Sequence, residues 1–148
     1  MKLEEEIKSK FRNEYHKARL NIMFTHTILG EKITPLFKNN DITAQQFNVL
    51  RILRGQHPQS INIKDIKERM LDKNSDVSRI IDRLFIKKLI LRQESKTDRR
   101  QKDVKISPAG LQLLQQMDGC EQAMDDLLNN LSVNEVKQLN FLLDKIRD

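Results

Sequence analysis

The chain has 148 residues, the size of one domain that can bury a core without disulfides. Its 27 lysines and arginines exceed its 21 aspartates and glutamates, so the formal net charge is +6, the pI is near 9.5, and a polyanionic partner is favoured. The single cysteine, Cys120, excludes an internal disulfide and a cysteine cluster for zinc, as expected of a protein in a reducing cytoplasm.

The sequence shows no sign of secretion or membrane insertion. It opens on MKLEEEIKSK, which lacks the apolar run of a signal peptide, and nowhere are eighteen consecutive residues apolar. We therefore expect a soluble cytoplasmic protein without membrane contact.

The first forty residues predict one long amphipathic helix. From Ile7 onward, steps of three, four or seven residues keep one helix face apolar. The positions are Ile7, Phe11, Tyr15, Ala18, Ile22, Leu29, Ile33 and Leu36.

Three shorter helices are predicted next. Thr43 and Gln46 form a capping-box pattern at the start of the first, which ends near Gly55. A second, short helix is marked by the spacing of Ile63, Ile66 and Met70. The third is SDVSRIIDRL, residues 75–84, which separates an apolar face from a polar one. The apolar face comprises Val77, Ile80, Ile81 and Leu84, and the polar face comprises Ser75, Arg79, Asp82 and Arg83.

A strongly charged stretch, KTDRRQKDVKIS, occupies residues 96–107. Its charges precede the alternating Val104, Lys105 and Ile106, a pattern that predicts the tip and second strand of a β-hairpin. The charge at this tip indicates either a solvated turn or a nucleic-acid contact. Two short helices, a polar-faced third and a hairpin with a basic tip together predict a winged helix-turn-helix.

The last forty residues predict two further helices. Ser107-Pro108 provides an N-cap followed by proline at the first helical position, and Ser132 with Glu135 forms a capping box after a break near Leu131. Helices as long as those at the two termini cannot both surround one small core, so we expect them to pack against a second copy. The interface residues expected are Ile7, Phe11, Leu139, Leu142 and Ile146.

The expected fold is therefore mainly α with a small β-wing, in a single domain. Residues 1–40 and 108–148 would form the dimerisation helices, and residues 41–107 would form the DNA-binding lobe.

These elements resemble the MarR family of bacterial transcription regulators. The pattern D-x-R-x-x-x-V-x-I-S-x-x-G, which starts at Asp98 and ends at Gly110, is similar to the family's wing and following helix. VSRIIDRL, residues 77–84, is similar to its recognition helix, and ITAQQFNVLRIL, residues 42–53, to the helix that opens its DNA-binding lobe. One departure is Lys88, where the family usually has glycine. A left-handed Lys88 would cost roughly 1 kcal/mol relative to glycine.

The resemblance implies a homodimer that binds a palindrome-like operator in double-stranded DNA. Side chains near the start of a recognition helix reach base edges, whereas other contacts go to phosphate. The candidates for base contact are Asn74, Ser75, Asp76, Ser78 and Arg79, and Arg83 is the candidate for backbone contact. Arg79 could bind guanine in bidentate fashion or pair with Asp76 or Asp82. Asp76 could accept from cytosine or hold Arg79 in place.

The hairpin tip would reach a flanking minor groove, whose negative potential attracts arginine. Its candidate residues are Lys96, Asp98, Arg99, Arg100 and Lys102. The resemblance assigns the insertion to Arg100, which Asp98 would orient.

The resemblance also implies an effector, because many relatives bind a small aromatic or phenolic anion between the dimerisation helices and the DNA-binding lobe. Tyr15, His16, Arg19 and His26 could line such a cleft, or have only packing or surface roles. Peroxide-sensing relatives carry their reactive cysteine in the first helix, which Cys120 does not match.

No metal or other cofactor is expected, because His16, His26, His57 and Cys120 lack metal-ligand spacing. An enzyme is not expected either, because no phosphate-binding glycine loop, glycine-framed nucleophile or distinctive carboxylate pair occurs. The alternative to a regulator is a helical dimeric adaptor that uses the winged-helix scaffold without binding DNA.

Overall fold

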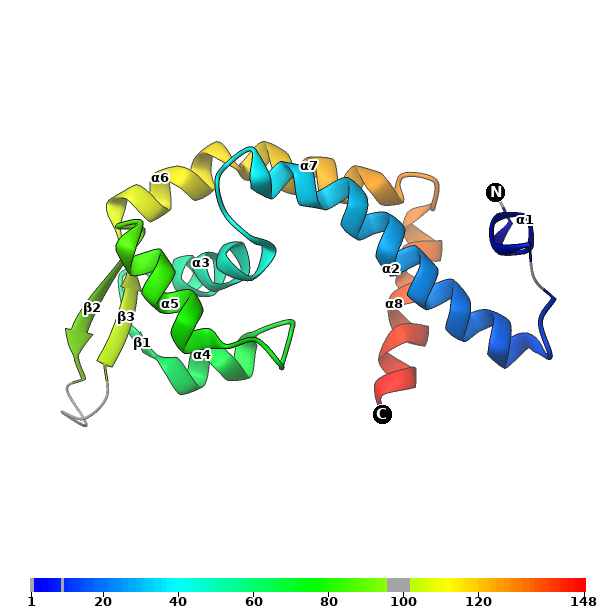
Figure 1. Ribbon diagram of the computed structural model, residues 1–148, viewed down its shortest axis with the longest axis horizontal. Helices are drawn as coiled ribbons and strands as arrows, with labels where there is room; N and C mark the ends of the chain where they lie inside the picture. The colour runs from blue at the N-terminus through cyan, green and yellow to red at the C-terminus, as the bar shows by residue number, and fades with distance from the viewer. Residues whose placement is uncertain (1, 9, 96–101) are drawn as a thin grey trace.

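Helices make up most of the chain, and a small antiparallel sheet lies at one end of the molecule (Figure 1). The structure is a computed structural model and describes residues 2–8, 10–95 and 102–148. The elements are α1 (Leu3–Ile7), α2 (Glu14–Lys38), α3 (Ala44–Gln56), β1 (Ile61–Asn62), α4 (Ile63–Arg69), α5 (Val77–Ile86), β2 (Ile90–Glu94), β3 (Lys102–Ile106), α6 (Pro108–Gln116), α7 (Asp118–Asp125), the 3-10 turn η1 (Asp126–Leu128) and α8 (Val133–Arg147). The predicted fold class, mainly α with a small β-wing, is confirmed.

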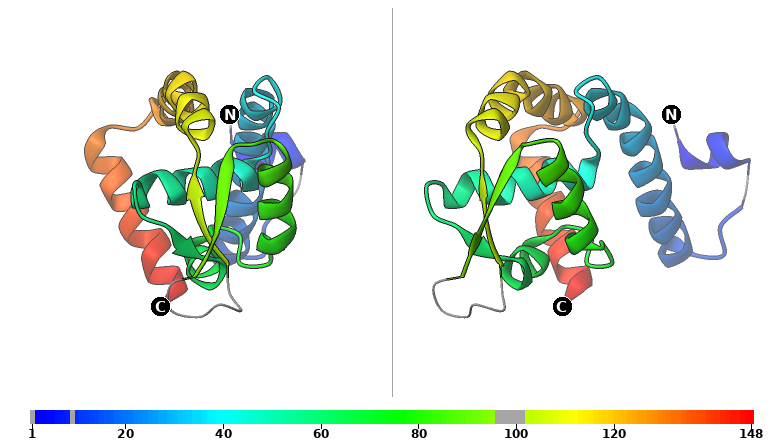
Figure 2. Two further views of the ribbon diagram at one scale, coloured as in Figure 1. Left: turned by 90° about the vertical axis from the view of Figure 1, so that its left-hand side faces the viewer. Right: turned by 60° about the vertical axis from the view of Figure 1, so that its left-hand side comes forward.

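The lobe formed by α3, α4, α5 and the three strands contains most of the core. The strand order is β1-β3-β2, and β3 pairs antiparallel with both neighbours, Val104 with Ile61 and Ile106 with Ile90. Figure 2 shows the β2–β3 hairpin next to α5. The core also takes Phe37 from α2 and Leu114 from α6, so the flanking helices are anchored in it. The hairpin was predicted, whereas the two-residue strand β1 was not.

Three predicted helix starts are confirmed by their hydrogen bonds. At α3 the Thr43 hydroxyl accepts from the Gln46 amide, and the Gln46 side chain accepts from the Thr43 amide, both at 3.1 Å. Ser107 caps α6 by accepting from the Gly110 amide at 3.0 Å. At α8 the Ser132 hydroxyl and amide both donate to Glu135 at 2.7 Å, and these bonds hold the pKa of Glu135 below its ordinary value.

The prediction of one continuous helix from Ile7 is wrong. α1 ends at Ile7, Lys8 takes a left-handed conformation with φ 47°, and α2 begins only at Glu14. The reason is local, because the Asn13 side chain accepts from the His16 amide at 2.9 Å and so caps α2. α1 then lies against α2 through buried Leu3.

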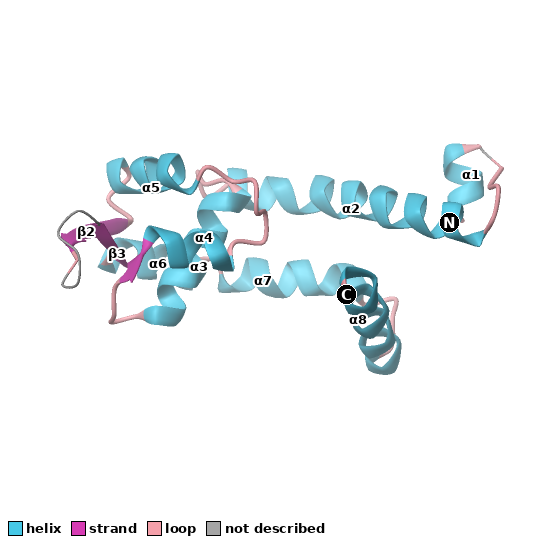
Figure 3. Ribbon diagram, turned by 90° about the horizontal axis from the view of Figure 1, so that it is seen from below, coloured by secondary structure: helices cyan, strands magenta, loops and turns pink. Residues whose placement is uncertain are grey.

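The first of the two predicted C-terminal helices is also interrupted. Met117, with φ −90° and ψ −1°, separates α6 from α7, and its side chain is fully buried. The predicted break near Leu131 is confirmed, since η1 ends at Leu128 and α8 starts at Val133. Figure 3 shows α2 and α7 running away from the lobe, with α8 turning off at the far end of α7. We call α2 and α7 the arm.

The turn after α5 contains the lysine found where glycine was expected. Lys88 has φ 61°, and the amides of Lys88 and Leu89 donate to the carbonyls of Phe85 and Leu84 at 2.9 and 3.0 Å. This is the Schellman pattern, which needs a left-handed residue at that position. The helix end therefore keeps the geometry expected of glycine, although a left-handed conformation is less favourable for lysine than for glycine.

Across the described residues, no helix combines the length and apolarity needed to cross a membrane.

Candidate nucleic-acid interface

Helix α5 buries one face and exposes the other, as its sequence predicted. Val77, Ile81 and Leu84 are buried in the core, which fixes the rotation of the helix about its own axis. Ser78, Arg79, Asp82 and Arg83 are exposed. The first turn of α5 therefore presents a hydroxyl and a guanidinium to solvent, side chains able to bond base edges or phosphates.

Asp76 is the N-cap of α5. Its carboxylate accepts from the Arg79 amide at 3.1 Å, so it stabilises the first turn of the helix through the Arg79 backbone. The sequence left open whether Arg79 binds guanine or forms an ion pair with Asp76 or Asp82. Within the described ranges, the Arg79 guanidinium forms no hydrogen bond or ion pair with either aspartate. Its side chain is exposed, so a ligand can reach it.

The carboxylate of Asp82 instead bonds Arg92 of β2. The Arg92 guanidinium also lies over the Phe85 ring, 4.8 Å from its centroid. These contacts attach α5 to the base of the hairpin, so the two elements keep a fixed relative position. Sequence reasoning missed Arg92, because nothing in a strand pattern shows which helix residue a cation will face.

The turn before α5 is held from two sides. The Asn74 amide donates to the Asp72 carboxylate at 3.0 Å, and the Leu71 amide donates to the Asn48 side chain of α3 at 3.0 Å. Asn74 is exposed, whereas Ser75 is half-buried and its hydroxyl has no hydrogen-bond partner among the described residues. Both line a cavity of about 370 Å³ between the starts of α3 and α5, together with Asp76, Arg79 and Arg83.

Of the five residues predicted at the hairpin tip, the structure describes one. Lys102 is exposed at the start of β3, where it pairs in register with Glu94 of β2. Lys96, Asp98, Arg99 and Arg100 lie outside the described residues, so their predicted contact with a minor groove stays a prediction.

Four of the five predicted dimer residues are exposed, and the fifth, Phe11, is half-buried. α8 has no buried residue, and Leu139, Leu142 and Ile146 are 36%, 47% and 67% exposed. Ile7 is exposed at the end of α1, and Phe11 packs edge-on against His16 in the turn before α2. Because of the break at Asn13, neither lies on the same helix as the rest of the N-terminal apolar stripe.

The four predicted effector residues all lie on α2. Tyr15, Arg19 and His26 are exposed, Tyr15 by 88%, and the half-buried His16 ring accepts from the Arg12 amide at 3.3 Å. A cavity of about 410 Å³ lies between α1, α2 and η1, and other side chains line it, such as Phe24, Ile28 and Leu127. Their part in ligand binding stays a prediction.

Cys120 is half-buried on α7 and packs against the core. Among residues 2–8, 10–95 and 102–148, no three histidine, cysteine or carboxylate side chains are grouped so that they could hold a metal ion.

A helix-turn-helix whose third helix exposes cationic side chains next to a β-hairpin is the architecture of a winged-helix DNA-binding protein. Comparison with known proteins agrees. The family model described as MarR family matches residues 42–102. The multiple antibiotic resistance protein MarR of Salmonella typhimurium is 32% identical over 124 residues, which cover 80% of each chain. The HTH-type transcriptional regulator MgrA of Staphylococcus aureus is 28% identical over 111 residues, covering 75% of this chain and 74% of MgrA.

Among solved structures, the S. aureus MepR–DNA complex superposes with a TM-score of 0.76 at 25% identity, covering 93% of this chain and 97% of MepR. The chain therefore belongs to the MarR family, a family of DNA-binding transcription regulators.

Proposed function

We propose that the chain is a homodimeric, sequence-specific regulator of transcription that binds a palindrome-like operator in double-stranded DNA. The observation that carries the proposal is the exposed face of α5, where the Arg79 side chain has no hydrogen-bond or ion-pair partner among the described residues while its backbone is fixed by Asp76. In this proposal Ser78 and Arg79 contact base edges in the major groove, and Arg83 contacts the phosphate backbone. The similarity to MepR, solved as a complex with DNA, supports this placement.

The exposed apolar face of α8 supports the homodimer. A helix with no buried residue and several exposed leucine, isoleucine and phenylalanine side chains contributes little to its own chain. Packing against a second copy would remove that surface from water, and a two-fold dimer would present two recognition helices to successive major grooves. A small aromatic or phenolic effector that prefers the conformation poorly suited to DNA would then release the operator.

The first experiment identifies the operator and tests DNA binding itself. Genomic DNA fragments retained by the purified protein are sequenced, and one bound fragment is titrated by fluorescence anisotropy over a salt series. A DNA-binding regulator loses affinity steeply as salt rises, because bound phosphates release counterions. A helical adaptor without DNA binding would retain no fragment and show no salt-sensitive binding to any duplex.

The second experiment tests the role of α5. Arg79→Ala should relax base preference at one position of each half-site, at a cost of about 1–3 kcal/mol per lost bidentate contact. The control is Arg12→Ala, which removes the same charge from an exposed residue outside the lobe. An Arg79→Ala protein with the base preferences of the control would reject α5 as the reading element.

A further inference from the structure

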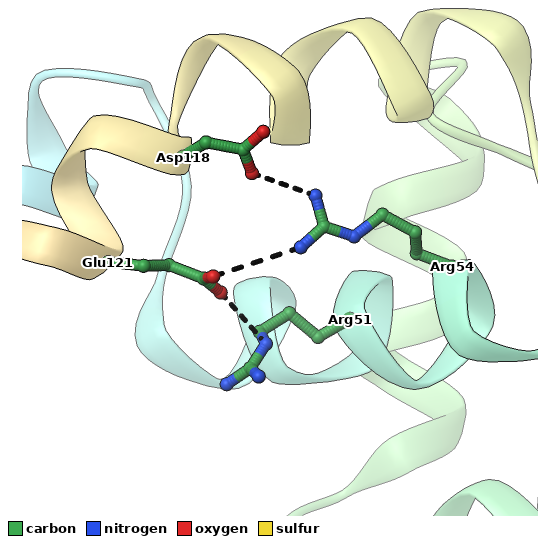
Figure 4. A network of polar contacts seen from close by, with 4 residues as sticks. All are labelled: Arg51, Arg54, Asp118 and Glu121. Carbon is green, nitrogen blue, oxygen red and sulfur yellow. Dashed lines mark hydrogen bonds and ion pairs between the residues drawn. The ribbon is translucent and has the colours of Figure 1, made fainter.

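Four charged side chains join the DNA-binding lobe to the arm (Figure 4). Arg51 and Arg54 lie on α3, and Asp118 and Glu121 lie on α7. Arg54 Nη1 is 3.0 Å from Asp118 Oδ1, Arg51 Nε is 2.9 Å from Glu121 Oε1, and Arg54 Nη2 is 3.9 Å from Glu121 Oε2. Arg54 and Glu121 each take part in two of the three ion pairs. We call the four residues the α3–α7 network.

The network lies directly after the joint between the lobe and α7. Met117 is fully buried in the lobe core, and its backbone departs from α-helical geometry. The next residue is Asp118, the first of α7. A rotation at this joint would swing α7 relative to α3, and the ion pairs lie where they oppose that swing.

The network also reaches the other helix of the arm. The Arg51 guanidinium lies over the Phe47 ring of α3, 6.0 Å from its centroid, and this ring packs against Phe37 of α2 with centroids 5.1 Å apart. Arg51 therefore contacts, directly or through one ring, both helices that leave the lobe. Arg51 therefore lies where α2, α3 and α7 converge.

Geometry makes the network a stronger restraint than one surface ion pair. Arg51 and Arg54 are one helical turn apart on α3, as are Asp118 and Glu121 on α7, so the attachments are spaced about 4.5 Å along each axis. A single pair allows rotation about itself, whereas two pairs a turn apart resist it. The Arg54 and Glu121 side chains are 34% and 32% exposed, whereas those of Arg51 and Asp118 are 53% and 57% exposed, so solvent screens the two shared residues less than the other two.

We propose that Arg51, Arg54, Asp118 and Glu121 are positioning residues that fix the orientation of the lobe on the arm and thereby set the operator half-site spacing. This inference rests on the proposed function, because half-site spacing has meaning only for a DNA-binding dimer. None of the four needs to touch DNA. Their effect is on the distance between two recognition helices, each of which keeps its own affinity for a half-site.

The test compares Asp118→Asn/Glu121→Gln, which removes all three ion pairs, with Glu31→Gln/Asp125→Asn. The control makes the same two chemical changes at arm residues that form no ion pair within the described part of the chain. Each protein is titrated with single half-site DNA and with full operators whose half-sites are moved apart or together by one or two base pairs. Active protein is counted by titration, so partial unfolding does not affect the ratios.

The network variant should bind the half-site with the affinity of the control. Its preference for the full operator over the half-site should fall about fivefold, which is the effect of losing roughly 1 kcal/mol of restraint. Its affinity should also depend less on half-site spacing. A ratio and a spacing profile equal to those of the control would overturn the inference.

A second measurement needs neither DNA nor a dimer. Spin labels are placed at Gln122→Cys on α7 and Lys64→Cys on α4, both exposed positions, in a Cys120→Ala background, and labelled chains are diluted with unlabelled ones. Pulsed EPR should give a broader intrachain distance distribution in the network variant than in the control. An unchanged width overturns the inference. A broader distribution in a protein that retains no DNA would reject the proposed function while supporting the orienting role of the network.

Discussion

At the scale of single residues, the functional face depends on side chains that fix backbone positions. Asp76 was predicted either to accept from cytosine or to hold Arg79 in place, and the structure shows its carboxylate capping the backbone amide of Arg79. A carboxylate at this position also interacts favourably with the positive end of the helix dipole. The cap explains how an acidic residue can sit next to a proposed DNA contact, because its charge is directed into the first turn of α5.

Lys88 gives a testable energetic prediction at the same scale. Its φ of 61° is unfavourable for a residue with a side chain, so Lys88→Gly should raise the free energy of unfolding by about 1 kcal/mol. Urea denaturation provides the measurement. The control is Lys67→Gly on the exposed side of α4, where helical geometry should make the same change destabilising by about 1 kcal/mol. Equal destabilisation by both substitutions would contradict the assigned turn geometry.

At the scale of elements, the helix starts and the apolar face of α5 could be predicted from the sequence because they depend on residues close in the chain. The pairs of Thr43 with Gln46 and Ser132 with Glu135 make caps within one turn, and α5 buries the expected Val77. The interruptions at Asn13 and Met117 could not, because an apolar spacing runs through both sites.

Contacts between distant elements were equally inaccessible from the sequence. Arg92 and Asp82 come from a strand and a helix, and Arg54 meets Asp118 across 64 positions of sequence. An exposed charge on an isolated helix gives no sign of which partner the fold brings to it. The candidate base contacts were therefore predictable as a helix face, whereas the contacts that hold this face in place were not.

Helix α8 gives a prediction at the element scale. Leu139→Asp/Leu142→Asp should yield unfolded or aggregated protein instead of a soluble monomer, because obligate dimers often have no stable folded monomer. The neighbouring exposed residues give the control, Gln138→Asp/Asn140→Asp, which adds the same charge without removing apolar surface. Sedimentation and circular dichroism measure both proteins. A folded monomeric wild type at micromolar concentration would reject the dimer.

At the scale of the whole molecule, the net charge of +6 is not enough to locate the DNA, since the lobe and the arm both carry cations. Salt dependence can separate local contacts from overall charge. Each phosphate contact contributes about 0.9 to the slope of log affinity against log salt concentration, whereas a distant surface charge contributes little.

The sequence predicts such a contact for Arg100, which lies outside the described residues. Arg100→Ala should lower the magnitude of the salt slope by roughly 2 if each chain of a dimer loses one full contact. It should also remove a preference for A·T-rich flanks while leaving the central half-site preference intact, because a narrow minor groove is recognised by its shape. The control is Lys145→Ala, which removes the same charge from the last turn of α8. Both proteins are titrated over a salt series against one operator and a version with exchanged flanks. If the two variants show the same slope and flank preference, the charged stretch at residues 96–107 makes no groove contact and is only a solvated turn.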